Sequence, residues 1–467
     1  MAEITEALAA FAATIKFSDL PQSLLEDTRR IVLDSIGCAI GGLTTDRGQI
    51  ALELARRLGG PGESTLMGTS DRVAVTNAAY ANAELINAQD FDAICASHCC
   101  PVVVAAALAM AESTRASGKD LLLSIALGLE IATRILSAEV PHYHPVADGP
   151  ERGKIVWGPV FGYAGSIFGA TVASGKLLNL DHERMANAIG AAGYLCPPNT
   201  MRKWAETAPI RMTKYGILGW GGQGGVTAAL MAEKGFLSDT DVFDGEYGFW
   251  RYTGQTEWRA ENVLADLGAK WQQNVIFKHY PLNYGCAGAV DNFIKAMEEN
   301  GLKPADIKKV KVTVWPITHF KWWRENRLRT TEDYCFSVNY AIACAAYRID
   351  PTRWLEAEVR GDPRVLDFMP RVEVTTDERA FGLAMLGDQA AGAQLFETEV
   401  MAKGRAFNVR TPQPKDESRN VDAVLTNKFR KITSRVLSPD KTEIIVRSVF
   451  ELAELKNVAD LMDMLTP

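Results

Sequence analysis

Apolar residues recur every three to four positions through most of residues 1–260, which is the period of an α-helix. The stretch 21–42 is typical, because Pro21 stands at a first-turn position and the pair Gly41-Gly42 closes it. Two later stretches are apolar nearly all round, which predicts helices buried inside a domain. The predicted helices that follow cover 76–92, 102–116, 120–136, 162–180 and 182–195.

The pattern changes between residues 270 and 410, where apolar and polar residues alternate. Val310, Val312 and Val314 fall on one face of an extended chain, which is the period of a β-strand. This part of the chain is therefore predicted to be a smaller α+β unit. Further strands are predicted at 371–377 and 395–402, and a helix at 334–347.

These patterns predict a mainly α protein in which a large all-helical domain is interrupted by a smaller α+β domain. The helical domain is expected to cover residues 1–268 and the α+β domain residues 269–410. Helical spacing then resumes, so residues 411–467 are expected to return to the helical domain as C-terminal helices. The polar stretch 411–420, which contains two prolines, is the expected linker.

Composition excludes several classes of protein. The chain has 467 residues, of which 47% are hydrophobic and 23% charged, with a formal net charge of −7. A general nucleic-acid partner is not expected, because phosphate contacts need a basic face. We expect neither a signal peptide nor a membrane span, since the N-terminus lacks a basic region and no uncharged run reaches the length of a bilayer. The 8 cysteines are expected to be reduced thiols in a cytoplasmic protein.

The stretch 89–101, QDFDAICASHCCP, concentrates acids, cysteines and a histidine. Zinc binds such residues, but structural zinc sites usually draw ligand pairs from two separated segments, and the sequence has no second C-x-x-C. No metal site is therefore predicted. Cys99 and Cys100 begin an apolar helix and are interpreted as buried core thiols.

Two other motifs are interpreted as structural. The stretch 219–225, GWGGQGG, contains G-x-G-x-x-G, but a dinucleotide fingerprint should follow a strand, and the surroundings here are helical. Close packing of a helix against its neighbours is the preferred interpretation. The stretch 142–145, HYHP, is expected to be a surface loop. No G-x-S-x-G elbow and no P-loop is present, so ordinary hydrolase and kinase chemistry lack their usual landmarks.

His98, Lys214 and Lys278 remain as candidates for chemistry. A single histidine is either a hydrogen-bonded core residue or a catalyst, and Asp90 and Asp92 lie close enough in sequence to orient its ring. Both lysines stand among apolar residues, where a solvated ammonium is less expected. Each lysine either extends its head to solvent along apolar surface or binds a ligand.

Several segments in order resemble the MmgE/PrpD family, which includes 2-methylcitrate dehydratase, cis-aconitate decarboxylase and iminodisuccinate epimerase. The resemblance covers nearly the whole chain. It implies a large helical domain with a smaller α+β lid domain, usually in a homodimer. The segments that carry it are NAELINAQDFD with His98, GSIFGATVASGKLLNLDHERMANAIGAAG, TKYGILGWGGQGG, KHYPLNYG, FSVNYAIACA and the C-terminal pair KF.

The resemblance also implies roles for particular residues. His98 takes the place of the catalytic histidine, and Asp90 is the acid upstream that would set its tautomer. Lys214 and Lys278 match lysines that line the substrate carboxylates, and both would stabilise an enolate-like intermediate. Substrate contacts are also implied for Tyr280, Asn283 and Asn87, of which the two asparagines stand where basic residues or a histidine are common.

The chain departs from the family pattern at three further positions. Ala93 and Ile94 replace an acid and a hydroxyl, and Val160 falls near a second family histidine. A substrate less charged or more apolar than methylcitrate is therefore expected.

The predicted function is that of a lyase that needs no cofactor. It would act on a small carboxylic acid by proton transfer at a carbon α to a carboxylate, as a dehydratase or decarboxylase. An isomerase or epimerase, a catalytically silent binding protein and a metal-dependent enzyme remain as alternatives.

Overall fold

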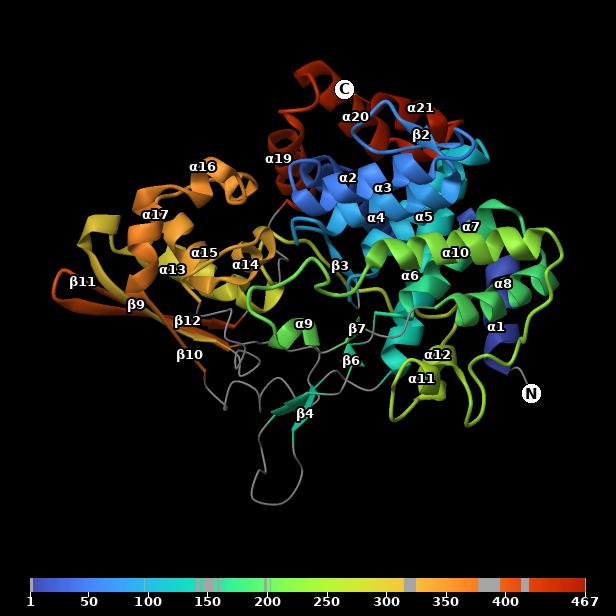
Figure 1. Ribbon diagram of the computed structural model, residues 1–467, viewed down its shortest axis with the longest axis horizontal. Helices are drawn as coiled ribbons and strands as arrows, with labels where there is room; N and C mark the ends of the chain where they lie inside the picture. The colour runs from blue at the N-terminus through green and yellow to red at the C-terminus, as the bar shows by residue number, and fades with distance from the viewer. Residues whose placement is uncertain are drawn as a thin grey trace.

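The computed structural model describes most of the chain, in several ranges. These ranges are 3–95, 97–139, 143–145, 155–157, 160–161, 163–196, 200–201, 203–314, 325–376, 395–412 and 420–466. The fold is mainly α with a smaller α+β part, which confirms the predicted fold class. Figure 1 shows the helical part on one side of the molecule and the α+β part on the other.

The N-terminal part is built from helices that follow the predicted pattern closely. The helix predicted over 21–42 is α2 (Gln22–Gly42), and the one predicted over 182–195 is α8 (His182–Leu195). The predicted helix 76–92 is shorter, because α4 (Val75–Asn87) ends before the acidic loop. The other helices are α1 (Glu3–Thr14), α3 (Asp46–Leu58), α5 (Cys99–Ser113), α6 (Gly118–Ala138), α7 (Ser166–Leu177), α9 (Lys203–Glu206), α10 (Leu218–Glu233), α11 (Phe249–Tyr252) and α12 (Ala260–Leu264).

Helix α6 is long and apolar enough to cross a membrane by length and composition alone. Within the described part of the chain it alone passes that test. However, 89% of its most apolar stretch is buried inside the fold. Helix α6 is therefore a core helix, as its all-round apolar pattern predicts.

The glycines of 219–225 lie inside α10, which confirms that this motif serves helix packing. A Cβ atom added to Gly225 would lie 2.5 Å from the Cβ of Ala170 on α7. A Cβ atom added to Gly219 would lie 2.5 Å from the backbone oxygen of Tyr80 on α4. Real Cβ atoms do not approach other atoms so closely, so only glycine lets α10 pack against both helices.

The α+β part contains a four-stranded sheet in the order β10-β9-β11-β12. Strands β9 (Ile307–Val314), β10 (Val372–Thr376) and β11 (Leu395–Ala402) confirm the predicted strands. Strand β12 (Arg405–Pro412) was not predicted, and it includes the first two residues of the expected linker. The helices of this part are α13 (Ala287–Glu299), α14 (Thr331–Phe336), α15 (Val338–Ala346), α16 (Ala357–Arg360) and α17 (Pro363–Phe368).

Two local predictions need correction. The helix predicted over 334–347 is divided between α14 and α15, because Ser337 is extended and caps α15 by accepting a hydrogen bond from the backbone N–H of Tyr340. The expected loop at 142–145 is in part a strand. Residues Tyr143–Pro145 form β4, which pairs with β5 (Ile155–Trp157), and residue 142 lies outside the described ranges.

The C-terminal helices pack on the helical part, next to α2 (Figure 1). They are α19 (Val421–Thr433), α20 (Pro439–Phe450) and α21 (Val458–Met464). Residues of these helices share one hydrophobic core with α2, α4 and α5. The exact domain boundaries stay a prediction, and most of the expected linker, 413–419, lies outside the described residues.

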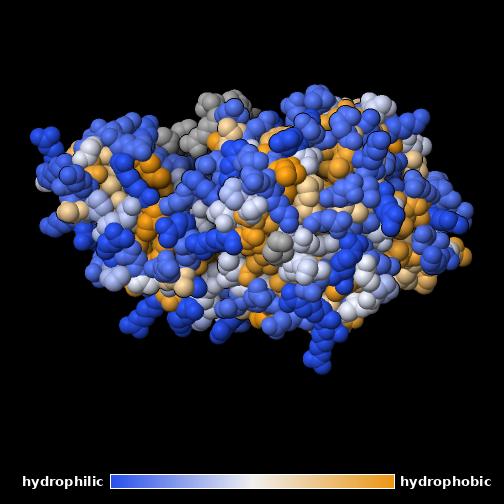
Figure 2. All heavy atoms as spheres, turned by 90° about the horizontal axis from the view of Figure 1, so that it is seen from above, coloured by the Kyte–Doolittle hydropathy of each residue, from blue (hydrophilic) through white to orange (hydrophobic). Residues whose placement is uncertain are grey.

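The face in Figure 2 is covered mainly by hydrophilic residues over both parts of the molecule. Hydrophobic residues appear between them in scattered groups rather than in one broad band. Such a mixed surface is usual for a protein whose core lies inside its own fold.

Candidate active site

The stretch between α4 and α5 carries most of the candidate residues into one place. Asn87 is the last residue of α4, and Asp90 then turns the chain with a φ of 52°. Strand β3 (Ile94–Cys95) pairs with β8 (Val275–Ile276), and His98 directly precedes α5. The β3–β8 pairing brings Lys278, two residues after β8, beside the loop that holds Asp90.

His98 is buried and is held by Asp92. Nδ1 of His98 lies 2.9 Å from Oδ2 of Asp92, and its Nε2 lies 3.7 Å from Oδ1 of Asp90. This geometry corrects the expected role of Asp90. Asp92 is the acid that accepts the hydrogen bond from Nδ1 and so fixes the tautomer, whereas Asp90 faces the other nitrogen.

Lys214 and Lys278 converge on Asp90. Nζ of Lys278 donates to Oδ1 of Asp90 over 2.9 Å and to its backbone oxygen over 2.8 Å. Nζ of Lys214 lies 3.6 Å from the same Oδ1. Both ammonium groups are buried. The interpretation that these lysines extend to solvent is therefore wrong, and they form a charged group with Asp90 inside the protein.

Asn87 joins His98 to a buried ion pair. Its Nδ2 donates to Oδ1 of Asp92 over 3.0 Å and lies 3.3 Å from Nδ1 of His98. Its Oδ1 accepts from Arg47 over 3.2 Å and lies 3.5 Å from Nζ of Lys214. Arg47 in turn pairs with Glu84 on α4 over 2.6 Å. Asn87 is thus fixed on both sides of its amide.

Tyr215 covers one face of the His98 ring. The two rings are stacked, with centroids 4.2 Å apart and an angle of 28° between their planes. The hydroxyl of Tyr215 accepts a hydrogen bond from Asn283 over 3.1 Å and lies 3.5 Å from Oδ2 of Asp90. Nζ of Lys214 lies 4.6 Å from the centroid of the same tyrosine ring. Asn283 therefore reaches the site through Tyr215.

The structure does not bring Tyr280 together with the other predicted residues in the contacts it shows. The Tyr280 ring stacks on Trp354 with centroids 5.2 Å apart, and its hydroxyl donates to Asp291 over 2.7 Å. These contacts lie in the core of the α+β part. Tyr280 therefore holds the segment that carries Lys278 rather than pointing its hydroxyl toward His98.

The neighbours of Asp90 and Asp92 lower the pKa of both carboxyl groups. Burial raises the pKa of Asp92, but the charge and hydrogen bond of His98, with Lys278 and Lys214, outweigh burial, so the pKa lies well below its ordinary value. Burial also raises the pKa of Asp90, while Lys214, Lys278 and His98 together bring it below the ordinary value. Both groups are carboxylates at neutral pH.

By distance alone, three of these groups could bind a metal ion. One ligand atom from each of Asp90, Asp92 and His98 lies within 4.8 Å of the other two. However, Lys278 and Lys214 already neutralise Asp90, and Asp92 and His98 are engaged with each other. A cation would meet two ammonium groups, so this donor set is a poor fit for a resident metal. The absence of a metal site stays a prediction.

The positions that depart from the family pattern offer no reactive side chain to this site. Ala93 is buried and contributes its backbone N–H, which donates to Asp34 over 2.9 Å. Ile94 lies in β3. Val160 lies in the two-residue strand β6 (Val160–Phe161), which pairs with β7 (Thr200–Met201). Cys99 and Cys100 are buried in the core, as predicted.

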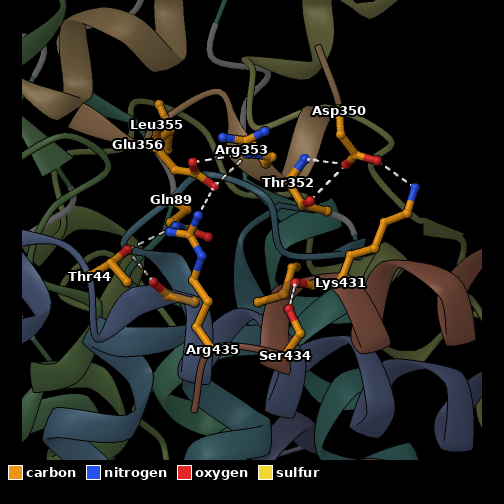
Figure 3. A pocket seen from close by; sticks show the side chains of 12 residues that line it. Thr44, Gln89, Asp350, Thr352, Arg353, Leu355, Glu356, Lys431, Ser434 and Arg435 are labelled. Carbon is orange, nitrogen blue, oxygen red and sulfur yellow. Dashed lines mark hydrogen bonds and ion pairs between the residues drawn. The ribbon is translucent and has the colours of Figure 1, made fainter. Parts of the chain in front are cut away.

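A separate cavity of about 250 Å³ lies between the helical and α+β parts (Figure 3). Gln89, which precedes Asp90, lines it, but His98 and the two lysines do not. Arg435 and Lys431 point across it toward Glu356 and Asp350, with which they form ion pairs. This cavity marks the junction of the two parts and is not the place where the candidate groups meet.

Sequence reasoning considered both Asp90 and Asp92 but gave the orienting role to Asp90, and only the direction of the chain at the turn decides between them. It missed Tyr215, Arg47 and Glu84 altogether. Tyr215 follows Lys214 directly and was passed over as an apolar neighbour. Glu84 gave a weak signal, as the one charged residue in the sequence of α4, whereas Arg47 gave none, because α3 carries several charged residues.

Comparisons with known proteins agree with this architecture. The model described as the MmgE/PrpD N-terminal domain matches residues 6–261, and the one described as the MmgE/PrpD C-terminal domain matches residues 280–452. The chain is 25% identical to the cis-aconitate decarboxylase of Homo sapiens, over 99% of this chain and 94% of the relative. It is 26% identical to the cis-aconitate decarboxylase-like protein oryM of Aspergillus oryzae, over 99% of this chain and 97% of the relative. It is 24% identical to the cis-aconitate decarboxylase of Aspergillus terreus, over 73% of this chain and 71% of the relative.

Proposed function

This chain belongs to the MmgE/PrpD family, and from that premise we propose that it removes carbon dioxide or water from a small carboxylic acid by proton transfer at His98. The chain is an enzyme of the lyase type. The observation that supports His98 as the acting group is its position between two carboxylates, with two buried lysines beside them.

His98 would act through Nε2. Its Nδ1 proton is engaged by Asp92, which leaves Nε2 to exchange a proton with the substrate. The carboxylate of Asp92 stabilises the imidazolium form that follows proton uptake. Tyr215 stacks on the ring and keeps it from rotating away. An imidazole suits this task because its ordinary pKa lies near neutral pH.

The chemistry can follow either of two balanced routes. In dehydration, the neutral Nε2 removes the proton from the carbon α to a carboxylate, and the electron pair expels a hydroxyl group from the β carbon. The hydroxyl leaves as water by taking the proton that the His98 imidazolium now carries. In decarboxylation, which begins with His98 protonated, the bond to a leaving carboxylate breaks and carbon dioxide departs. The electron pair passes to the remaining acid as an enolate-like form, and the imidazolium donates its Nε2 proton to carbon.

Lys214 and Lys278 would stabilise the negative charge that develops in both routes. Fixed cations in a site shielded from water stabilise an enolate more strongly than solvent does. Asp90 holds both ammonium groups until the substrate carboxylate arrives. The proposed enzyme needs no metal or organic cofactor for this step, and acts as a homodimer in the cytoplasm.

The substrate would be a small carboxylic acid. The relatives named above are cis-aconitate decarboxylases, which makes cis-aconitate the first acid to test. Ala93 and Ile94 supply neither an acid nor a hydroxyl. The aromatic rings of Tyr163 and Tyr215 lie close to His98, and Trp204 packs against Tyr215. These features favour an acid that is less charged or more apolar than methylcitrate.

An isomerase on the same scaffold is the second candidate. The hydrocarbon side chains of Ala93 and Ile94 favour it, because an isomerase needs no group to assist departure of water. Incubation with cis-aconitate, citrate, 2-methylcitrate and a set of apolar and aromatic acids distinguishes the two by mass spectrometry. A lyase releases carbon dioxide or water, whereas an isomerase leaves the mass unchanged. No conversion of any acid would contradict the lyase proposal.

A further inference from the structure

A second buried charge pair lies directly behind the loop of Asp90 and Asp92. Nζ of Lys428, on α19, donates to Oδ1 of Asp34, on α2, over 2.7 Å. The same Nζ donates to the backbone oxygen of Phe91 over 2.6 Å and lies 3.8 Å from the centroid of its ring. One ammonium group thus joins two helices to the residue between the two site acids.

Each member of this pair reaches the active-site segments through their backbone. Oδ2 of Asp34 accepts from the backbone N–H of Ala93 over 2.9 Å. Nζ of Lys428 also contacts the backbone oxygen of Lys278 over 3.4 Å. Asp92 is therefore held on both sides, at Phe91 and at Ala93, while the segment of Lys278 is held by the same ammonium.

Burial acts on the pKa of both groups of the pair. Lys428 and Asp34 are buried. Burial raises the pKa of Asp34, and Lys428 offsets only part of this rise. Burial lowers the pKa of Lys428, but the charge and hydrogen bond of Asp34, together with smaller contributions from its neighbours, outweigh burial and keep the pKa above its ordinary value. The ammonium therefore stays charged, and the pair contributes neither a proton nor a direct contact to His98 among the interactions that the structure shows.

We propose that the Lys428–Asp34 pair is a positioning device that sets the distance and angle between Asp92 and His98. This inference rests on the proposed role of His98 as the proton-transfer group. Lys428 and Asp34 are positioning residues, because they act through the backbone of the loop and not on the substrate.

The loop needs such support because its backbone is strained. Asp90 has a φ of 52°, in the left-handed region that favours glycine, and the loop has only the two-residue ladder of β3 beside it. A loop held by so few regular hydrogen bonds would sample other positions of Asp92. A shift of about 1 Å in a catalytic group costs up to about 100-fold in rate.

A purely structural role is the alternative, and a charge-balanced double variant separates the two. Lys428→Met leaves the carboxylate of Asp34 buried and unpaired, which destabilises the fold. Asp34→Asn with Lys428→Met removes both charges and keeps an oxygen for the N–H of Ala93. The double variant should unfold at a higher temperature than Lys428→Met alone. In both variants the backbone oxygen of Phe91 loses the hydrogen bond from Lys428, so the loop loses its support. Arg430→Met is the matched control, since Arg430 is an exposed residue of α19 that pairs with Glu443.

The first readout is independent of turnover. Protein with ¹³C-labelled histidine is titrated in the wild type and in the double variant, with the His98 signal assigned by His98→Gln. The charged and titratable groups in contact with His98 are Asp90, Asp92, Tyr163 and Tyr215, and Lys214 and Lys278 pair with Asp90 behind them. None of them is altered by the double variant. We expect its His98 signal to titrate at a different pH from that of the wild type.

The second readout uses the acid that the screen identifies. We expect the double variant to lose about 10- to 100-fold in kcat with little change in KM, and Arg430→Met to match the wild type. A double variant with the wild-type His98 titration and the wild-type kcat would overturn the positioning role. If the wild type converts no acid at all, the proposed function fails, and the titration alone decides whether the pair positions His98.

Discussion

At the scale of single residues, the site is a set of buried charges that neutralise one another. Asp90 is paired with two ammonium groups, and Asp92 with the imidazole of His98. Because the site is shielded from water, removing one member of such a pair leaves a buried charge without a partner. This lowers the free energy of unfolding by about 3–5 kcal/mol. In the proposed reaction, the same two cations would meet the substrate carboxylate.

Tyr280→Phe separates the substrate-binding role implied by resemblance from the structural role that the geometry supports. The variant keeps the ring that stacks on Trp354 but loses the hydrogen bond from the hydroxyl to Asp291, so it should lose about 1.5–3 kcal/mol of unfolding free energy. Its KM should stay close to that of the wild type. Denaturant unfolding measures the stability and steady-state kinetics measures KM. An increase in KM without a loss of stability would support the substrate-binding role of Tyr280 and contradict the structural one.

Sequence alone located most of the residues that meet at this site but not their pairing. Lys214 and Lys278 were found because charged residues among apolar ones are conspicuous, and His98 and Asp90 because the stretch 89–101 concentrates acids, cysteines and a histidine. Asp92 was weighed beside Asp90, yet which acid faces Nδ1 depends on the positive φ of Asp90, and no residue pattern signals that value for an aspartate.

At the scale of elements, long helices were predictable and short strands were not. Helix α8 has the predicted bounds because its apolar residues repeat over several turns. Strands β3 and β8 have two residues each, too few for a period of two to show. This short pairing nevertheless places Lys278 beside Asp90. The strand pair that matters most for the site is therefore the one that the sequence pattern predicts least well.

The end of α6 carries a buried carboxyl group whose pKa predicts how stability depends on pH. Glu139 is buried, and its Oε2 accepts a hydrogen bond from Gln255 over 3.1 Å. Its Oε1 has no partner among the described residues. Burial raises the pKa of Glu139 to about 8, and the hydrogen bond from Gln255 offsets this only in part.

The consequence is a loss of stability as the pH rises. The unfolded chain releases the proton of Glu139 near its ordinary pKa, whereas the folded chain keeps it up to about 8. The free energy of unfolding should therefore fall between these values, by at most about 1.4 kcal/mol per pH unit. Glu139→Gln should remove this slope, as urea unfolding across that range would show. The exposed Glu261→Gln is the control, and equal slopes in all three proteins would contradict the account.

At the scale of the whole molecule, the site lies where the two parts meet. His98 begins a helix of the larger core, while Tyr215 belongs to the core of the α+β part. Figure 1 shows β3 between the two parts. The pattern of the sequence predicted both parts, but not that residues near 204–215 leave the helical part and pack into the other core. The packing of residues 204–215 into the α+β core depends on contacts between segments that are distant in the sequence, which a local pattern does not show.

Lys431→Met with Arg435→Met tests which charges hold the two parts together. Both side chains are about half exposed and reach across the cavity of Figure 3 to Asp350 and Glu356. Exposed ion pairs contribute about 1 kcal/mol or less each, so the double variant should unfold almost as the wild type does. Lys278→Met, which breaks a buried pair, should be far less stable. A loss of several kcal/mol in the surface variant would contradict this view.

The central claim is that His98 moves a proton to or from carbon. The most direct measurement is proton NMR of the substrate and product in deuterated buffer, with the wild type and with His98→Gln. The account predicts deuterium at the carbon α to a carboxylate with the wild type. It predicts a loss on the order of 100-fold or more in that incorporation with the folded variant. A His98→Gln protein that incorporates deuterium at the wild-type rate would contradict the account.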